Sequence, residues 1–87
     1  MYTKKYHIEK IEEFNAHNPL YDEIGDNVCY LVYLNVGERG WFMYDTGNYY
    51  DRPHRIHTST VTSVEYIDDI VIVATRNTRI TFKLIKE

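Results

Sequence analysis

The chain has 87 residues, 44% of them hydrophobic and 15% aromatic, which is enough for one apolar core and too little for a second. We therefore expect a single domain over residues 1–87. The formal net charge of −3 fits neither a DNA mimic, which would be far more acidic, nor a general nucleic-acid binder, which would be basic. No apolar run reaches the ~18 residues of a transmembrane helix, and none follows Lys4 and Lys5 as in a signal peptide, so a cytoplasmic protein is expected.

The N-terminal segment carries two competing patterns. Ile8, Ile11 and Phe14 recur at the spacing of one helix face, with charged residues between them. Tyr6 and Ile8 also alternate with polar neighbours, as they would in a strand. We favour a short amphipathic helix, which Asn18-Pro19 would end, and a strand is the alternative.

A β-hairpin is predicted next. Residues 28–36 are apolar at both odd and even positions, as in a strand that is covered on both faces or central in a barrel. The loop 37–40 contains two glycines, which can adopt the positive φ of a hairpin, and residues 41–46 run back. Cys29, the single cysteine, cannot form an internal disulfide and is expected to be a small buried hydrophobe.

The third predicted strand, roughly residues 55–66, is long and changes parity along its length. Val61 falls on the face opposite to Val64 and Tyr66. This change indicates a bulge or a sharp bend near residues 59–62, which is how a strand turns the corner of a barrel.

A second hairpin follows the turn predicted at Asp68-Asp69. Residues 70–75 are rich in β-branched side chains, and Arg76-Asn77 forms a two-residue connection in which Asn tolerates the left-handed conformation. Residues 78–85 then alternate strictly between apolar and polar. The side chains expected to face inward are Ile80, Phe82 and Leu84.

Threonines line these last three strands. They are Thr58, Thr60, Thr62, Thr75, Thr78 and Thr81. We interpret them as solvent-facing residues of good strand propensity. The alternative is a hydroxyl-rich face beside Arg76 and Arg79 that holds an anionic ligand.

Five strands in so short a chain predict a mainly β fold, namely a small bent five-stranded barrel or roll, SH3-like or OB-like, with a short N-terminal helix. Folds of this kind carry many unrelated activities, so function has to be argued from particular side chains.

The segment 47–57 joins two predicted strands and is expected to be a surface loop. It is rich in Tyr and Arg, which contribute strongly to protein interfaces and also stack on nucleotide bases. We expect the contact surface here, with Trp41 and the arginine-bearing final hairpin beside it. The alternative is that the tyrosines only cover an open barrel end. The candidate binding residues are Trp41, Tyr49, Tyr50, Arg52, His54, Arg55, Arg76 and Arg79.

His54 and His57, with Asp45 or Asp51, raise a metal hypothesis. A His-x-x-His pair in a loop is a weak signal, and on a strand these two positions point to opposite faces, so no metal site is predicted. The sequence also shows no nucleophile elbow, phosphate-binding glycine loop or recognisable acid–base motif. We expect neither an enzyme nor a bound cofactor.

Residues 56–61 (IHTSTV) and 73–82 (VATRNTRITF) resemble short uncharacterised β-proteins of phages and mobile elements. The shared pattern is roughly I-x-T-S-x-V, then V-x-T-x-N-(S/T)-x-(aromatic)-x-(F/L). It covers the last third of the chain, and Ile80 stands where the pattern has an aromatic residue. The resemblance implies a small protein that acts on host machinery, by blocking a defence enzyme through direct contact or by sequestering a nucleotide signal.

Three functions therefore remain open. The first is a protein-binding inhibitor or adaptor that uses the aromatic, arginine-bearing loop. The second is a binder of nucleotides or single-stranded nucleic acid, with a base stacked on an aromatic ring and phosphate held by arginines. The third is a homo-oligomer joined through strand edges or tyrosines.

Overall fold

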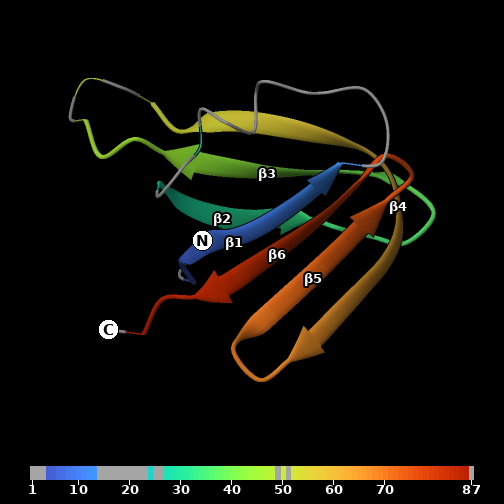
Figure 1. The fold of residues 1–87 in the computed structure, drawn as a ribbon. Helices are drawn as coiled ribbons and strands as arrows, with labels where there is room; N and C mark the ends of the chain where they lie inside the picture. Colours follow the sequence, from blue (N-terminus) through green and yellow to red (C-terminus); the bar gives the residue numbers. More distant parts are fainter. Residues whose placement is uncertain (1–3, 14–23, 25–26, 49, 51, 87) are drawn as a thin grey trace.

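The structure, a computed structural model, describes residues 4–13, 24, 27–48, 50 and 52–86. In this part of the chain, six antiparallel strands form a closed barrel in chain order (Figure 1). The strands are β1 (Tyr6–Glu13), β2 (Val28–Tyr33), β3 (Arg39–Asp45), β4 (His54–Ile67), β5 (Ile70–Thr75) and β6 (Thr78–Leu84). The mainly β barrel is confirmed, but it has one strand more than predicted.

The additional strand is β1, so the prediction of an N-terminal helix was wrong. β1 pairs with β6 from end to end, and its register shifts between Ile8 and Lys10. This bulge lets Ile8 and Ile11 both pack against the core, although residues three apart in a regular strand face opposite sides. A bulged strand thus produced the same spacing as a helix face. Phe14 lies outside the described residues.

The β2–β3 hairpin is confirmed, with β2 ending at Tyr33. Gly37 has a φ of +92° and supplies the left-handed residue that the connection was expected to need. Gly40 has a different role, because it lies within β3 and is buried. A Cβ atom at Gly40 would lie 2.8 Å from the carbonyl oxygen of Tyr33, so this close approach of two strands requires glycine.

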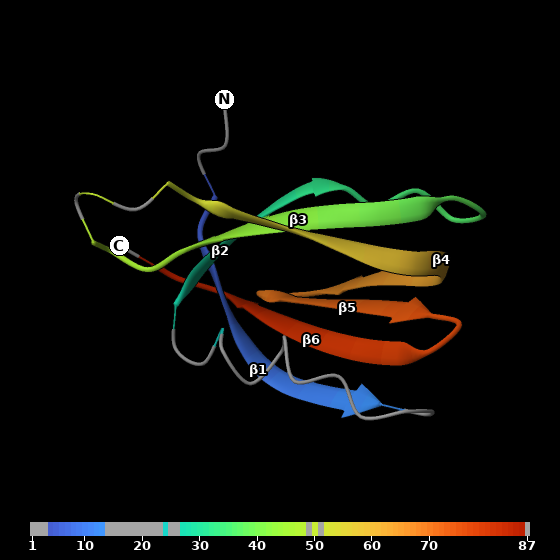
Figure 2. The same ribbon diagram turned by 90° about the horizontal axis from the view of Figure 1, so that it is seen from above.

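β4 bends as predicted and belongs to both halves of the barrel. Its first part pairs with β3 up to Thr60, and its second part pairs with β5 from Val61 onward. The register shifts between Val61 and Ser63, which places the irregularity at the predicted bend. In Figures 1 and 2, β4 curves from the side of β3 to the side of β5.

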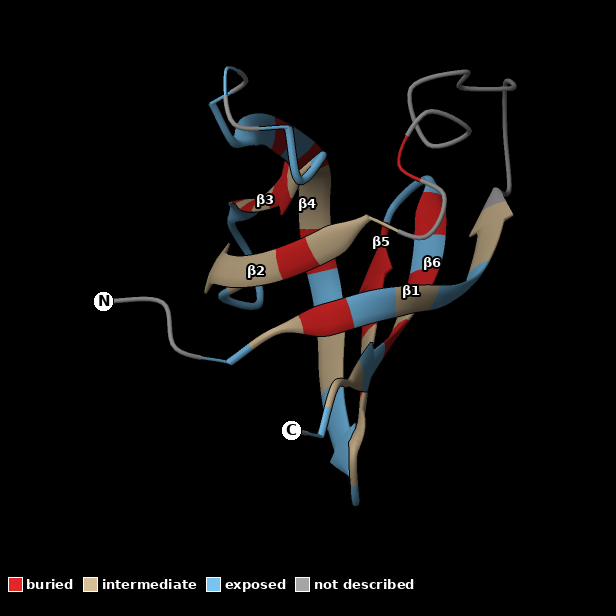
Figure 3. Ribbon diagram, turned by 90° about the vertical axis from the view of Figure 1, so that its left-hand side faces the viewer, coloured by how far each residue is buried: buried red, intermediate tan, exposed pale blue. Residues whose placement is uncertain are grey.

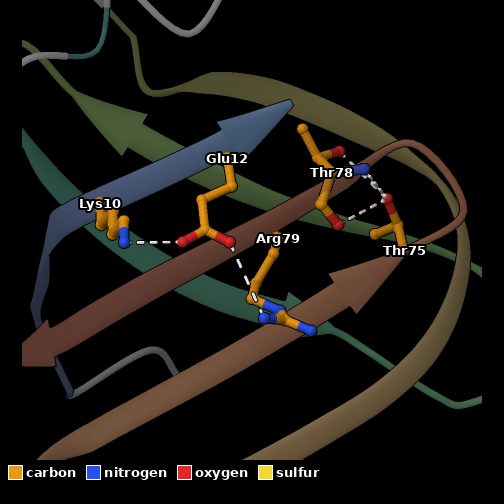
Figure 4. Close-up of polar contacts among 5 residues, drawn as sticks. All are labelled: Lys10, Glu12, Thr75, Thr78 and Arg79. Atoms are coloured by element: carbon orange, nitrogen blue, oxygen red, sulfur yellow. Dashed lines mark hydrogen bonds and ion pairs between the residues drawn. The ribbon is translucent and has the colours of Figure 1, made fainter. Parts of the chain in front are cut away.

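The β5–β6 turn at Arg76-Asn77 closes in a way that the sequence did not suggest. Among the described non-glycine residues only Asp68 has a positive φ, so Asn77 does not adopt the left-handed conformation. Instead, the Thr75 hydroxyl accepts a hydrogen bond from the backbone N–H of Asn77 at 3.3 Å. It accepts a second from the backbone N–H of Thr78 at 3.0 Å (Figure 4). This is the local side-chain turn that Ser and Thr favour.

The threonines are not all on the solvent face. Thr58, Thr75 and Thr78 are buried, with exposed fractions of 2%, 4% and 5%. Their hydroxyl groups hydrogen-bond to backbone or to each other, which is the condition for burying a polar group at low cost. The interpretation as solvent-facing residues was therefore wrong at these three positions.

The core lies inside the barrel, where buried and exposed positions alternate along the strands (Figure 3). Phe42 and Phe82 are fully buried and meet edge to face, with ring centroids 5.3 Å apart. Ile80 and Phe82 face inward as predicted, while Leu84 is half-buried against the core. The seam between β1 and β2 is short, with Tyr6 opposite Cys29 as its paired residues.

Candidate functional site

Trp41 and Arg55 lie together on the outer wall of the barrel. The Arg55 guanidinium carbon is 4.5 Å from the centroid of the Trp41 ring, which is the geometry of a cation–π contact. Trp41 is half-buried and Arg55 is exposed. This pair was predicted to contribute to binding, and the structure places its two members in contact.

Strand register explains why these side chains meet. In β3 the buried positions Phe42 and Tyr44 alternate with outward Trp41 and Met43. Residues paired across antiparallel strands share a face, and Met43 pairs with Arg55 on one side and with Tyr30 on the other. Trp41 pairs with His57, and their ring centroids are 6.3 Å apart. We call this surface the Trp41 face; its residues are Tyr30, Trp41, Met43, Arg55 and His57.

The two histidines of the metal hypothesis are kept apart. His54 stacks on the buried Tyr44, with ring centroids 4.9 Å apart and an interplanar angle of 19°. His57 instead faces outward beside Trp41. Within the described residues, no three His, Cys, Asp or Glu side chains come together as a metal site would require.

The connection between β3 and β4 projects from one end of the barrel (Figures 1 and 2). Gly47, with a φ of +78°, donates its backbone N–H to the Asp45 carboxylate at 2.9 Å. The Tyr50 side chain is 89% exposed, and Arg52 is exposed as well. Tyr49 lies outside the described residues. Tyr50 and Arg52 are therefore accessible at this end of the barrel.

The turn of the final hairpin lies at the other end of the barrel. In Figures 1 and 2 the β5–β6 turn and the β2–β3 loop share that end, so Arg76 is not beside the loop that carries Arg52. Arg79 forms a separate contact, because its guanidinium lies 3.7 Å from the carboxylate of Glu12 on β1 (Figure 4). A hydrogen bond from Lys10 to the same carboxylate is the main reason why the pKa of Glu12 is lowered.

A shallow hollow with a volume of about 400 Å³ lies at the end of the barrel that carries Arg76. We call it the arginine cavity; its lining residues are Arg39, His57, Thr58, Ser59, Thr60, Arg76 and Asn77. Of these residues only Arg76 was among the candidate binding residues predicted from sequence, but Thr58 and Thr60 belong to the hydroxyl-rich face that was the alternative interpretation of the threonines. His57 belongs to both surfaces, so the arginine cavity and the Trp41 face adjoin.

Cys29 is confirmed as a buried core residue and is no part of either surface. Burial raises the pKa of its thiol to about 12, which favours the protonated, less reactive form at neutral pH.

Comparison of the chain with models of protein families, with curated proteins and with solved structures finds no match. Among the described residues, no helix has the length and apolar character needed to cross a membrane.

Proposed function

We propose that this protein acts by binding another protein, and that the Trp41 face is the contact surface. The observation that carries the proposal is the Arg55 guanidinium lying over the ring of Trp41, on a wall that also presents Tyr30 and Met43. Trp, Tyr, Met and Arg are the residue types enriched in protein interfaces, and Trp, Tyr and Arg dominate their hot spots.

The form of the surface supports the same proposal. The Trp41 face lies on three adjacent strands, whose backbones are held by cross-strand pairing, so its side chains are positioned before a partner arrives. A partner that stacked on Trp41 and Arg55 would desolvate a large aromatic ring without ordering a loop. Tyr50 and Arg52, at the end of the same β3–β4 pair, could extend the contact.

The resemblance of residues 56–61 and 73–82 to phage and mobile-element proteins supports a choice of partner class. We propose an enzyme of host defence, which the protein would inhibit by covering its surface. His57, on the Trp41 face, belongs to the first of these segments.

The test is capture of proteins from a lysate of the native host on immobilised wild type, Trp41→Ala and Arg55→Ala. Tyr66→Ala is the matched control, because Tyr66 is an aromatic residue, 73% exposed, beside the β4–β5 turn. We expect one protein to be retained by wild type and Tyr66→Ala and lost with the other two variants. The retained protein is then purified, and its Kd for each variant is measured by calorimetry.

Each substitution on the Trp41 face should weaken that Kd by at least about tenfold, since hot-spot truncations cost roughly 2 kcal/mol or more. Circular dichroism of each variant shows whether the barrel is still folded. Equal affinity of folded Trp41→Ala, Arg55→Ala and wild type would assign the contact surface elsewhere.

A further inference from the structure

The arginine cavity forms where three separate segments meet. Thr60, at the bend of β4, pairs with Arg39 of β3 on one side. On the other side its carbonyl oxygen accepts the backbone N–H of Arg76 at 3.1 Å. The two arginines are thus anchored on opposite sides of one residue, and both line the same hollow of about 400 Å³. That volume is within the range of sites for small ligands, roughly 300–1,000 Å³.

The charge of the arginine cavity is positive. Arg39 and Arg76 are permanent cations, and none of the described lining residues is acidic. The nearest acid in sequence, Glu38, accepts a hydrogen bond from the Tyr33 hydroxyl at 2.7 Å. This bond is also the main reason why the pKa of Tyr33 is raised.

Both guanidinium groups keep donors for a ligand. The Nε of Arg39 donates to the carbonyl oxygen of Thr58 at 3.2 Å, which orients the group, and among the described residues its terminal nitrogens have no acceptor. In the part of the chain that the structure describes, the Arg76 guanidinium makes no hydrogen bond or ion pair. An oriented guanidinium beside a second one is suited to the several oxygens of a phosphate.

Ser59 supplies an independent observation at the same place. Its hydroxyl oxygen is buried and has no hydrogen-bond partner among the described residues, although Ser59 lines the arginine cavity. Neighbouring Thr58, by contrast, uses its hydroxyl for Gly40. Buried polar atoms in folded proteins are normally paired, so an unpaired hydroxyl on a residue that lines the cavity is consistent with a polar ligand at this place.

We propose that the arginine cavity binds the phosphate group of a small ligand, with Arg39 and Arg76 on its oxygens and His57 at the rim. The ring centroids of His57 and Trp41 are 6.3 Å apart, so two neighbouring aromatic side chains lie next to the arginine cavity. A nucleoside monophosphate could therefore place its base on these rings, whereas inorganic phosphate would use the cavity alone. The proposal does not depend on a protein partner at the Trp41 face.

The test is calorimetric titration of the purified protein with inorganic phosphate, adenosine 5′-monophosphate and adenosine at fixed ionic strength, together with thermal unfolding. We expect a phosphate-bearing compound to bind and to raise the melting temperature, and adenosine to do neither. Tighter binding of the monophosphate than of inorganic phosphate would identify a nucleotide ligand. Similar affinities would identify a site for phosphate itself.

Three variants distinguish binding in the arginine cavity from nonspecific attraction of an anion to positive charge. Arg76→Gln and Arg39→Gln should each weaken binding by about tenfold or more, because each removes charge-assisted hydrogen bonds. Arg79→Gln is the control with the same loss of charge, and its affinity should match wild type because Arg79 pairs with Glu12. If Arg39→Gln unfolds, Arg76→Gln decides, since no described fold contact uses the Arg76 side chain. No binding of phosphate or monophosphate, or equal binding by Arg76→Gln and Arg79→Gln, would overturn the proposal.

Discussion

The Arg55 guanidinium lies 4.5 Å from the centre of the Trp41 ring, on neighbouring strands of the outer barrel wall. Arg55 therefore covers part of the single tryptophan of the chain. Because Trp41 is the single tryptophan, its fluorescence reports how far this ring is exposed to solvent.

Arg55→Ala should uncover that ring without unfolding the barrel. We expect the acrylamide quenching constant of Trp41 fluorescence to rise, and the free energy of unfolding to fall by about 1 kcal/mol or less, as for a solvent-exposed cation–π contact. Arg52→Ala, which removes an exposed arginine of the β3–β4 connection, serves as the control and should leave quenching unchanged. Equal quenching in wild type and Arg55→Ala would show that the contact does not persist in solution.

Cys29 should resist modification in the folded protein. Burial raises the pKa of its thiol to about 12, and the thiolate is the reactive form. At pH 8 we expect a thiol reagent such as Ellman's reagent to leave native protein unmodified and to react fully in denaturant. Rapid reaction under native conditions, at a rate independent of denaturant, would contradict the burial of Cys29.

The same buried thiol makes stability depend on alkaline pH. Its pKa is about 12 in the folded protein and near 9.0 without burial, so its contribution is complete below pH 9 and is lost between pH 9 and about 12. Over that range we expect the free energy of unfolding to fall by roughly 1.4 kcal/mol per pH unit because of this thiol. Denaturant unfolding of Cys29→Ala should show a shallower slope. Burial also raises the pKa of Tyr6, so a smaller slope should remain at the highest pH values.

Thr58→Val tests a buried hydroxyl that hydrogen-bonds to the backbone of β3. The Thr58 Oγ1 accepts the backbone N–H of Gly40 at 3.0 Å, and valine would leave that buried N–H without a partner. We expect a loss of about 1–3 kcal/mol in the free energy of unfolding. Thr62→Val is the matched control, because Thr62 is exposed and its hydroxyl donates to the carbonyl oxygen of Ala74, which water can replace. Its loss should be under about 1 kcal/mol; equal losses would refute the distinction.

Gly40→Ala should destabilise the barrel through steric contact alone. The added Cβ would lie 2.8 Å from the backbone carbonyl oxygen of Tyr33 and 3.1 Å from a methyl group of Val61, and the carbonyl cannot move without shifting β2. We expect a loss of about 1–3 kcal/mol, the usual cost of overpacking. Chemical denaturation against wild type measures it, and an unchanged midpoint would mean that the strands separate easily at this position.

Much of the fold was predictable because the signals are local. Alternation of apolar and polar residues defines β6, and the change of parity at Val61 indicated the bend of β4. β1 was not predictable in the same way, because a bulge gives Ile8 and Ile11 the spacing of a helix face. Pairing with β6, far along the chain, decides that this segment is a strand.

The candidate site was predictable in part. Trp41 and Arg55 were identified by residue type, and register brings them into contact. Arg39 and Ser59 were not predicted as binding residues, because Arg39 lies in the predicted loop 37–40 and Ser59 in a threonine-rich strand. These two residues line the same cavity as Arg76 only because β4 bends and the β5–β6 turn is hydrogen-bonded to it through the backbone of Arg76 and Thr60.

The sequence by itself therefore determined a small, mainly β domain with a buried Cys29. Both follow from local patterns, because the apolar or polar character of neighbouring residues indicates which positions of a strand are buried. Tertiary structure alone decided that the barrel has six strands and that an arginine cavity adjoins the Trp41 face. The physical reason is that both depend on hydrogen bonds between residues distant in the chain, such as the one from the Arg76 backbone N–H to Thr60.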